Sequence, residues 1–259
     1  WIAAIPKAEL HVHLEGSVDA QTLTELDSSL RIGDARRALE FLDFAGFIQS
    51  FIFVNRRLQA PADYALVARR LFARLREQNV TYAEVILSAG VVLWKHQDFD
   101  AIFRALVEEA NQAAPGLTIA WNLDAVRQFS PDQAMAVVEL AAARIDAGVL
   151  SFGLGGDELR GEAKDFRAVF ASARSRGLRL TCHAGETAGP ASIWQALECG
   201  AERIGHGVHA VEDPVLVRHL ADCQIPLEIS ITSNLRTGAI ASLATHPVRR
   251  FHEAGIPIV

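Results

Sequence analysis

Leu178-Arg-Leu-Thr-Cys-His-Ala-Gly-Glu-Thr187 is typical of a buried strand that ends in a turn of small residues. At that turn the chain presents the imidazole of His183 and, three residues later, the carboxylate of Glu186. An imidazole beside a carboxylate suits a metal ligand next to a group that transfers a proton. The alternative for Glu186 is a helix N-terminal carboxylate, which the helix dipole favours. The pair is weak evidence for an active site by itself, and it becomes strong evidence only together with candidate site residues from other segments of the chain.

The chain alternates strand-like and helical segments around this stretch. After a first strand over 9–14, strand-like runs begin near Thr81, Leu117, Val149, Leu178, Arg203, Pro226 and Ile256. Strands that alternate with helices of this length indicate right-handed crossovers and a parallel sheet. Eight such units predict a (β/α)8 TIM barrel that forms a single domain over residues 1–259. An open doubly wound sheet is the runner-up, but the Gly-x-Gly-x-x-Gly turn that it predicts is missing from the sequence.

The helices between these strands have clear boundary signals. Residues 20–58 are expected to be mostly helical, and a further helix is expected over 63–78. Ser130-Pro131 and Asp213-Pro214 each predict a capped helix start with proline in the first turn. Gly148 is expected to close the first of these two helices. The expected apolar face in the 20–58 segment consists of Phe41, Leu42, Phe44, Phe47, Ile48 and Phe51.

Two places depart from a regular barrel. The eighth strand, Ile256-Pro-Ile-Val259, stops as soon as it starts, and no helix follows it. The segment near Asp27 is short for a first crossover. We therefore expect that the eighth strand and the C-terminal helices are truncated, and that residues are missing near Asp27.

Composition narrows the class of protein. Half of the 259 residues are hydrophobic and 22% are charged, which is ordinary for a globular protein with a sizeable core. The apolar runs are far shorter than the roughly 20 residues of a membrane span. A net charge of −6 argues against nucleic acid as a partner. The three cysteines indicate a reducing cytoplasm, and they exclude the base-flipping zinc deaminases, which need a Cys-x-x-Cys pair.

Three histidines form the candidate metal site. His11 and His13 are two residues apart on the first strand, so they share a face near its carboxyl end. His183 ends the fifth strand, where it can meet them at the mouth of a barrel. Three imidazoles suit zinc or a similar ion with an open position for water. The alternative is packed or hydrogen-bonded core histidines. Cys182 should face the other way and pack.

Other strand ends supply further candidates. Gly205-His-Gly-Val-His209 ends the sixth strand, where His206 is placed to polarise a water or stabilise charge; His209 has the weaker claim. Gly153-Leu-Gly-Gly-Asp-Glu158 ends the fourth strand and exposes backbone N–H groups, although a tight loop would have the same glycines. The fourth strand has no lysine to bridge two metals, which favours one metal ion. The remaining histidines, His96, His219, His246 and His252, are expected at the surface.

Read together, these segments resemble the adenosine deaminase family of the amidohydrolase superfamily. Five ordered motifs carry the resemblance over nearly the whole chain: 6–17 (Pro-Lys-Ala-Glu-Leu-His-Val-His-Leu-Glu-Gly-Ser), 155–158 (Gly-Gly-Asp-Glu), 181–187 (Thr-Cys-His-Ala-Gly-Glu-Thr), 203–209 (Arg-Ile-Gly-His-Gly-Val-His) and 233–238 (Ser-Asn-Leu-Arg-Thr-Gly).

The resemblance implies a role for each candidate. It implies one Zn2+ per chain held by His11, His13 and His183, with Glu186 protonating N1 of a purine and His206 orienting the attacking water. It implies Gly156 as the backbone donor to N3, and it places Glu15, with His13, at the substrate. The family's remaining zinc ligand, an aspartate after the eighth strand, would lie beyond Val259.

The resemblance implies an enzyme that deaminates a 6-aminopurine, and we expect adenosine or an adenosine derivative. The family's best-known adenosine enzymes have aspartate at the position of Glu15, and members with glutamate there include ones acting on free adenine or modified adenosine derivatives. Adenine deaminase and 6-amino-6-deoxyfutalosine deaminase are therefore alternatives. A non-catalytic ligand-binding barrel is the competing class.

Overall fold

The structure is a computed structural model that describes residues 1–113 and 115–259. Its internal contacts divide the chain into two compact units, unit 1 (Trp1–Trp121) and unit 2 (Asn122–Val259). The boundary falls inside a strand, between Trp121 and Asn122. The single domain expected from the sequence stays a prediction.

Seven strands follow one another along the chain, and their order in the sheet is their order in the sequence. The strand pairs within each unit are parallel, as the alternation of strands and helices predicts. The strands are β1 (Lys7–His13), β2 (Val80–Leu87), β3 (Thr118–Val126), β4 (Val149–Gly155), β5 (Arg179–Ala184), β6 (Arg203–His206) and β7 (Leu227–Glu228). The expected eighth strand is a single parallel bridge between Ile258 and Leu227.

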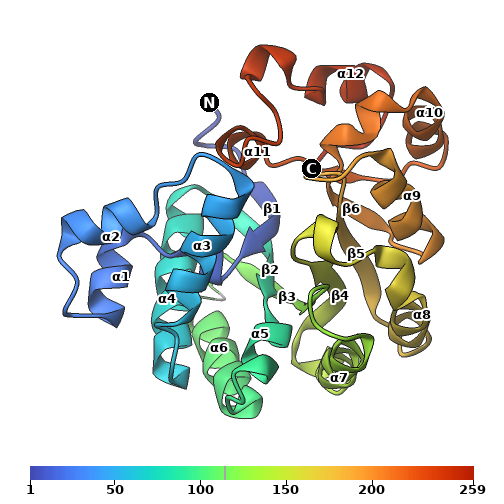
Figure 1. Cartoon of the computed structure of the whole chain (residues 1–259). Helices are drawn as coiled ribbons and strands as arrows, with labels where there is room; N and C mark the ends of the chain where they lie inside the picture. The colour runs from blue at the N-terminus through green and yellow to red at the C-terminus, as the bar shows by residue number, and fades with distance from the viewer. Residues whose placement is uncertain (114) are drawn as a thin grey trace. The chain divides into compact units, whose positions relative to one another are not determined.

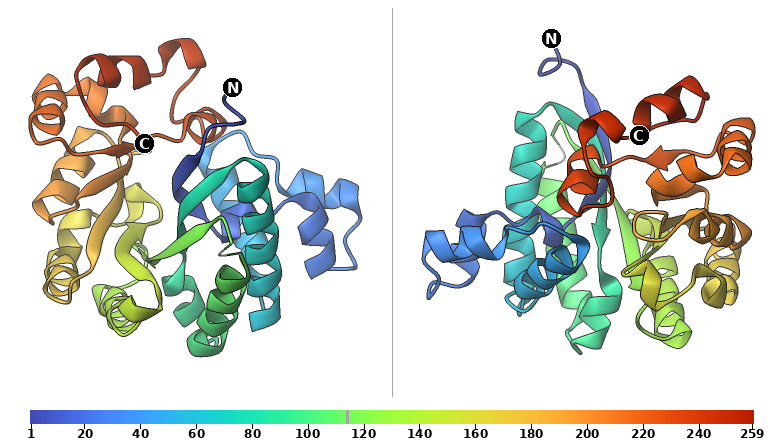
Figure 2. Two further views of the ribbon diagram at one scale, coloured as in Figure 1. Left: turned by 180° about the vertical axis from the view of Figure 1, so that it is seen from behind. Right: turned by 45° about the horizontal axis from the view of Figure 1, so that its top comes forward.

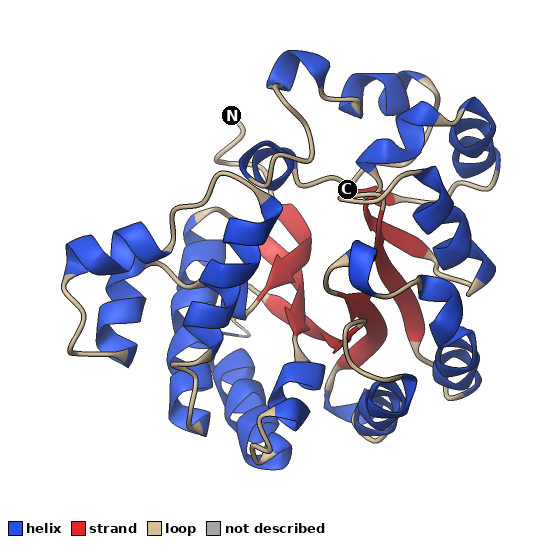
Figure 3. Ribbon diagram, viewed as in Figure 1, coloured by secondary structure: helices blue, strands red, loops and turns tan. Residues whose placement is uncertain are grey.

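Unit 1 holds β1, β2 and the helices between and after them. These are η1 (Glu15–Ser17), α1 (Ala20–Leu26), α2 (Ile32–Ala38), α3 (Phe44–Asn55), α4 (Pro61–Glu77), α5 (Ala89–Trp94) and α6 (Phe99–Ala113). Helices α4 and α6 pack on each other, and α4 also packs on β2 (Figure 3). Trp121 is fully buried there, with its ring centroid 6.2 Å from Phe72 and 5.9 Å from Phe103. Aromatic contacts of this kind dominate the stability of a small core.

The segment over 20–58 is helical, as expected, but in three short helices. Phe41, Phe44, Phe47 and Phe51 form a ladder of ring contacts with centroid distances of 5.4 to 6.0 Å. Leu42, expected in the same apolar face, is 93% exposed, so that part of the prediction is wrong. The reason is that Leu42 precedes the start of α3 and therefore does not follow the helical period.

Unit 2 continues the alternation from β4 to β7. Its helices are α7 (Pro131–Ala142), η2 (Ile145–Ala147), η3 (Glu158–Arg160), η4 (Ala163–Phe166), α8 (Arg167–Ser175), α9 (Pro190–Glu198), η5 (Val208–Glu212), α10 (Pro214–Asp222), α11 (Ile231–Arg236), η6 (Leu243–Thr245) and α12 (Val248–Glu253). Helix α7 packs on β4, and α8 and α9 pack on β5 (Figure 1). The view from behind shows the same three helices along one side of these strands (Figure 2).

The predicted helix starts are confirmed by their capping bonds. The Ser130 hydroxyl accepts from the backbone N–H of Gln133, and the Asp213 carboxylate accepts from the N–H groups of Val215 and Leu216. Helix α7 ends at Ala142, earlier than expected, and a 3₁₀ turn carries the chain to Gly148, whose φ of 93° lies in the left-handed region. No helix among residues 1–113 and 115–259 is long and apolar enough to cross a membrane.

Candidate active site

In unit 1, β1 ends with two neighbouring imidazoles. The ring centroids of His11 and His13 lie 5.3 Å apart, which agrees with the shared face predicted from their spacing. The edge of the His13 ring meets Phe51 of α3 with a centroid distance of 6.3 Å. Burial, and then the nearby His11, lower the pKa of His13 to about 3. This ring is therefore neutral at pH 7, which is the form that binds a metal ion.

Glu15 follows β1 directly, in η1, and is only 1% exposed. Its Oε1 accepts from the backbone N–H of Ser88 at 3.0 Å. Its Oε2 is buried, with no hydrogen-bond partner among the residues that the structure describes. Burial raises the pKa of Glu15 to about 7, against the opposing effects of the Ser88 N–H and Lys95. The carboxyl group thus retains an unused oxygen for a hydrogen bond.

In unit 2, β5 ends in the turn that carries His183 and Glu186. Gly185 has a φ of +70°, a conformation in which a side chain is strained. A Cβ on this residue would lie 2.5 Å from the Ile193 side chain and 3.4 Å from the Cα of Gly207. The turn therefore requires glycine, and it leaves Glu186 only 6% exposed.

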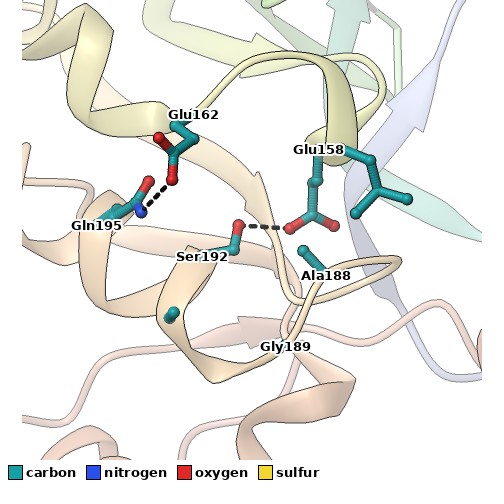
Figure 4. Close-up of a pocket in the computed structure, with 8 residues that line it drawn as sticks. Glu158, Glu162, Ala188, Gly189, Ser192 and Gln195 are labelled. Carbon is teal, nitrogen blue, oxygen red and sulfur yellow. Dashed lines mark hydrogen bonds between the residues drawn. The ribbon is translucent and has the colours of Figure 1, made fainter.

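The carboxylate of Glu158 holds this turn from η3. It accepts from the backbone N–H groups of Gly185, Glu186 and Thr187 at 2.7, 2.8 and 2.9 Å. The Ser192 hydroxyl adds a fourth donor at 2.5 Å (Figure 4). Charge-assisted hydrogen bonds of this kind are about twice as strong as neutral ones. The main chain that carries Glu186 is therefore fixed through three consecutive amides.

Arg127 holds the other side of the same turn. Its guanidinium donates to the carbonyl of His183 and, at 3.0 Å, to the carbonyl of Gly161. The side chain is only 3% exposed. Cys182, one residue before His183, is fully buried, and burial raises the pKa of its thiol to about 12. The thiol packs in the core, as expected.

The glycines at the end of β4 make room for an acid on β3. Asp124 is 3% exposed, and a Cβ on Gly153 or Gly155 would clash with its carboxylate. The same Cβ on Gly155 would lie 3.5 Å from Nδ1 of His183. Glycine at 153 and 155 therefore leaves room for the Asp124 carboxylate, and the Gly155 position borders both this carboxylate and Nδ1 of His183.

His206 ends β6 in a strained conformation. Its φ of 65° lies in the left-handed region, which costs a residue other than glycine about 1 kcal/mol or more. Its Nδ1 lies 2.9 Å from Nδ2 of Asn234 in α11, and its Nε2 lies 3.5 Å from Oε2 of Glu186. Its ring centroid is 5.6 Å from that of His183. His183, Glu186 and His206 are therefore brought together within unit 2.

Thr237 completes the surroundings of Glu186. Its hydroxyl lies 2.9 Å from the carbonyl of Ser233 and 3.4 Å from Oε1 of Glu186. Gly156 follows β4 with a φ of +96°, and the Gln128 side chain occupies the space of a Cβ there. This position therefore requires glycine, which leaves the backbone of residue 156 uncovered by a side chain of its own. His209 lies in η5, where its backbone N–H donates to the carbonyl of Gly185 at 3.0 Å while its Nδ1 lies 2.7 Å from Oε1 of Glu212.

A cavity of about 330 Å³ lies beside the turn in unit 2 (Figure 4). Its polar lining includes Glu158, Glu162, Ser192 and Gln195, and the amide of Gln195 donates to Glu162 at 3.0 Å. Glu158 enters it with its carboxylate already bonded to four donors. None of His183, Glu186 and His206 lines this cavity, so it is distinct from the group that the sequence predicts.

Several residues around the site were missed by the sequence analysis. His246 was expected at the surface, but it is only 6% exposed and lies 3.3 Å from the amide oxygen of Asn234, so that prediction is wrong. Glu158 and Asn234 belong to the motifs 155–158 and 233–238, but no role was assigned to either residue, and Asp124 and Arg127 lie outside the five motifs. Each is buried, and a buried polar side chain must find a partner, but the sequence does not say which one.

Comparison with known proteins gives one consistent family. The family model for adenosine deaminase matches residues 6–259. The aminodeoxyfutalosine deaminase of Streptomyces avermitilis is 37% identical and aligns with 100% of this chain and 75% of its own length. The adenosine deaminase of Klebsiella pneumoniae is 33% identical over 98% of this chain and 80% of its own. The crystal structure of adenine deaminase from Arthrobacter aurescens superposes with a TM-score of 0.92, at 26% identity, over 98% of this chain and 81% of that one.

Proposed function

Since this chain belongs to the adenosine deaminase family and is a hydrolytic deaminase with the TIM-barrel fold, we propose that it converts a 6-aminopurine nucleoside, adenosine or a derivative of it, to the 6-oxo purine and ammonia. The reaction adds water at C6 of the ring, protonates N1 and expels the amino group. Each step needs a group with a defined protonation state. The residues of the two units supply these groups as follows.

His11, His13 and His183 are proposed to hold one zinc ion. Each offers one ring nitrogen as a ligand. The low pKa of His13 keeps its ring neutral. The Asp124 carboxylate and Nδ1 of His183 both border Gly155, which supports a role for this acid in orienting a ligating imidazole. A bound zinc ion would lower the pKa of a water molecule to about 7, so that a nucleophile forms at neutral pH.

Glu186 is proposed to give its proton to N1 of the purine. The observation that carries this proposal is the fixation of its backbone by Glu158 together with its position 3.5 Å from His206. Fixing the main chain on both sides of a proton donor keeps the donor within reach of one ring nitrogen. His206 orients the attacking water, and the backbone N–H of Gly156 donates to N3.

Glu15 is proposed to bind a sugar hydroxyl through its unused Oε2. A nucleoside supplies a hydroxyl donor for this buried oxygen, whereas free adenine has no sugar and leaves the oxygen to a water molecule. This argument favours nucleosides over adenine. Within the nucleosides, the likeness to aminodeoxyfutalosine deaminases supports 6-amino-6-deoxyfutalosine as a second candidate beside adenosine. We also place the reaction in the cytoplasm, because all three cysteines are free thiols.

Metal removal and substrate comparison test this proposal together. The purified protein is stripped with a chelator, and ammonia release from adenosine and from 6-amino-6-deoxyfutalosine is measured before and after one equivalent of zinc is returned. We expect the stripped protein to lose its activity and zinc to restore it. Full activity after removal of all bound metal would contradict the metal site. Absence of turnover of either nucleoside by the zinc-loaded protein would contradict the substrate class.

A further inference from the structure

A line of hydrogen bonds runs from the backbone of α12 to the ring of His206. The backbone N–H of Val248 donates to Nδ1 of His246 at 3.2 Å. Nε2 of His246 lies 3.3 Å from Oδ1 of Asn234, and Nδ2 of Asn234 lies 2.9 Å from Nδ1 of His206. Asn234 is completely buried, and His206 and His246 are 5% and 6% exposed. All four residues belong to unit 2.

The backbone N–H of Val248 determines which atom donates and which accepts in every hydrogen bond of this line. A backbone N–H can only donate, so Nδ1 of His246 must accept and cannot carry a proton. The neutral ring then carries its proton on Nε2 and donates to Asn234. This fixes the orientation of the amide, with Oδ1 toward His246 and Nδ2 toward His206. An amide nitrogen also only donates, so Nδ1 of His206 accepts as well.

We propose that Asn234 and His246 are positioning residues that set the tautomer of His206, with its ring proton on Nε2. The proposal rests on the role of His206 in the proposed function. The Nε2–H group points toward Glu186, whose Oε2 is 3.5 Å away. His206 thus enters the reaction as a hydrogen-bond donor at Nε2, which can orient an attacking water or stabilise negative charge. It does not enter as a neutral base at that nitrogen.

The opposite tautomer is disfavoured at Nδ1 of His206. A proton on Nδ1 would face the N–H group of Asn234, so that two donors would meet without an acceptor between them. In a buried site an unsatisfied polar group is costly because no water replaces the lost hydrogen bond. The strained backbone of His206 is consistent with such a constraint, because residues keep an unfavourable φ where surrounding contacts determine their position.

The tautomer can be read directly from 15N chemical shifts of protein labelled in its histidine rings. In the wild-type protein we expect His206 to show a protonated Nε2 and an unprotonated Nδ1. The variant Asn234→Asp keeps the shape of the side chain but presents only acceptors, so we expect it to place a proton on Nδ1 of His206. A wild-type protein with the proton on Nδ1, or an unchanged His206 tautomer in N234D, would overturn the proposal.

Two further variants distinguish an effect of this line of hydrogen bonds on His206 from a loss of folding. His246→Gln retains an amide donor toward Asn234, so we expect the wild-type tautomer of His206. His246→Leu removes that donor and frees the amide to rotate, so a mixture of tautomers is expected. The same mixture in H246Q and H246L would contradict the direction of the line. Asn55→Asp, which creates a carboxylate at a buried asparagine of α3 in unit 1, serves as the matched stability control.

Kinetics provide the second readout. We expect N234D to lower kcat on the preferred nucleoside about 100-fold while KM changes less than threefold. The reason is that the proton of the His206 ring changes from Nε2 to Nδ1 while the ring itself stays in place. A merely structural role would lower the fraction of active protein and leave kcat per folded molecule unchanged. If the protein proves to deaminate no purine, the chemical shifts still decide the tautomer, so failure of the proposed function and failure of the proposed role of this line of hydrogen bonds are distinguishable.

Discussion

Two buried glutamates follow strands of the sheet, and they are bonded in opposite ways. Glu15, after β1, is 1% exposed, and Glu158, after β4, is 7% exposed. Both begin a short 3₁₀ helix. Glu158 uses both carboxylate oxygens and accepts from four donors. Glu15 uses one oxygen for the Ser88 N–H, and its other oxygen has no partner among the described residues.

The difference indicates what each carboxylate is for. A buried carboxylate with all its hydrogen bonds satisfied is a fixed part of the scaffold, since moving it would break several charge-assisted bonds together. A buried carboxylate with a vacant oxygen, and with its pKa raised to about 7, carries a desolvation cost that a ligand donor can relieve. Glu158 therefore fixes the turn that carries Glu186, and the vacant Oε2 of Glu15 supports its proposed role in substrate binding.

The largest expected effect on the rate comes from substitution of Glu186, whose backbone N–H is bound by Glu158. Glu186→Gln keeps the shape of the side chain but cannot transfer a proton to N1, so we expect kcat to fall about 10³-fold. The zinc content, measured by elemental analysis of the same sample, should stay near that of the wild type. A rate within tenfold of the wild type would remove Glu186 from the reaction.

Glu158→Gln tests the scaffold side of the comparison. The amide would turn an N–H group toward backbone N–H groups, so we expect the unfolding free energy to fall by about 2–3 kcal/mol. Displacement of the turn should lower kcat about 100-fold. Glu162→Gln, in the same cavity but exposed, is the control and should change neither quantity appreciably. Normal kcat in E158Q would mean that the turn keeps its geometry without this carboxylate.

Glu15→Gln tests the substrate side. The variant loses the charged acceptor for the sugar, so we expect KM for nucleosides to rise about tenfold, which corresponds to about 1.4 kcal/mol. The rate on free adenine should change little because adenine has no sugar. Steady-state kinetics on both substrates measure this difference. Equal losses on adenine and on nucleosides would show that Glu15 also acts as a fixed part of the scaffold.

The smallest effect concerns His246 and pH. Burial lowers the pKa of His246, so the folded protein binds this proton less readily than the unfolded chain. The stability that depends on its neutral form is present above pH 6.5 and is lost as pH falls below that value. Urea unfolding of metal-depleted protein at pH 7.5 and 5.5 should therefore show a smaller loss for H246Q than for the wild type. An equal loss in both would contradict the neutral ring.

The sequence predicts the frame of the site better than its supports. The alternation of strands and helices, together with the caps at Ser130 and Asp213, indicates the strand ends from which His11, His13, His183 and His206 come, because periodicity and capping are local properties of the chain. Leu42 was wrongly assigned to the apolar face of the helix, because the run of apolar residues begins before α3 does.

The supports depend on partners far along the chain. Glu158 bonds to a turn 27 to 29 residues later, and Asn234 bonds to a histidine 28 residues earlier. No local pattern marks such pairs. His246, beside Pro247 in a loop, looks like a surface residue until the fold buries it. Burial of a polar residue is decided by tertiary packing. It therefore cannot be read from the residues that neighbour it in the sequence.

Measurement of kcat/KM for adenine, adenosine and 6-amino-6-deoxyfutalosine on the zinc-loaded protein tests the central claim most directly. Ammonia release gives the rate for all three with one assay. We predict turnover of at least one nucleoside with a kcat/KM about tenfold or more above that for adenine, because only a nucleoside engages Glu15. Turnover of adenine alone, or of none of the three, would contradict the account.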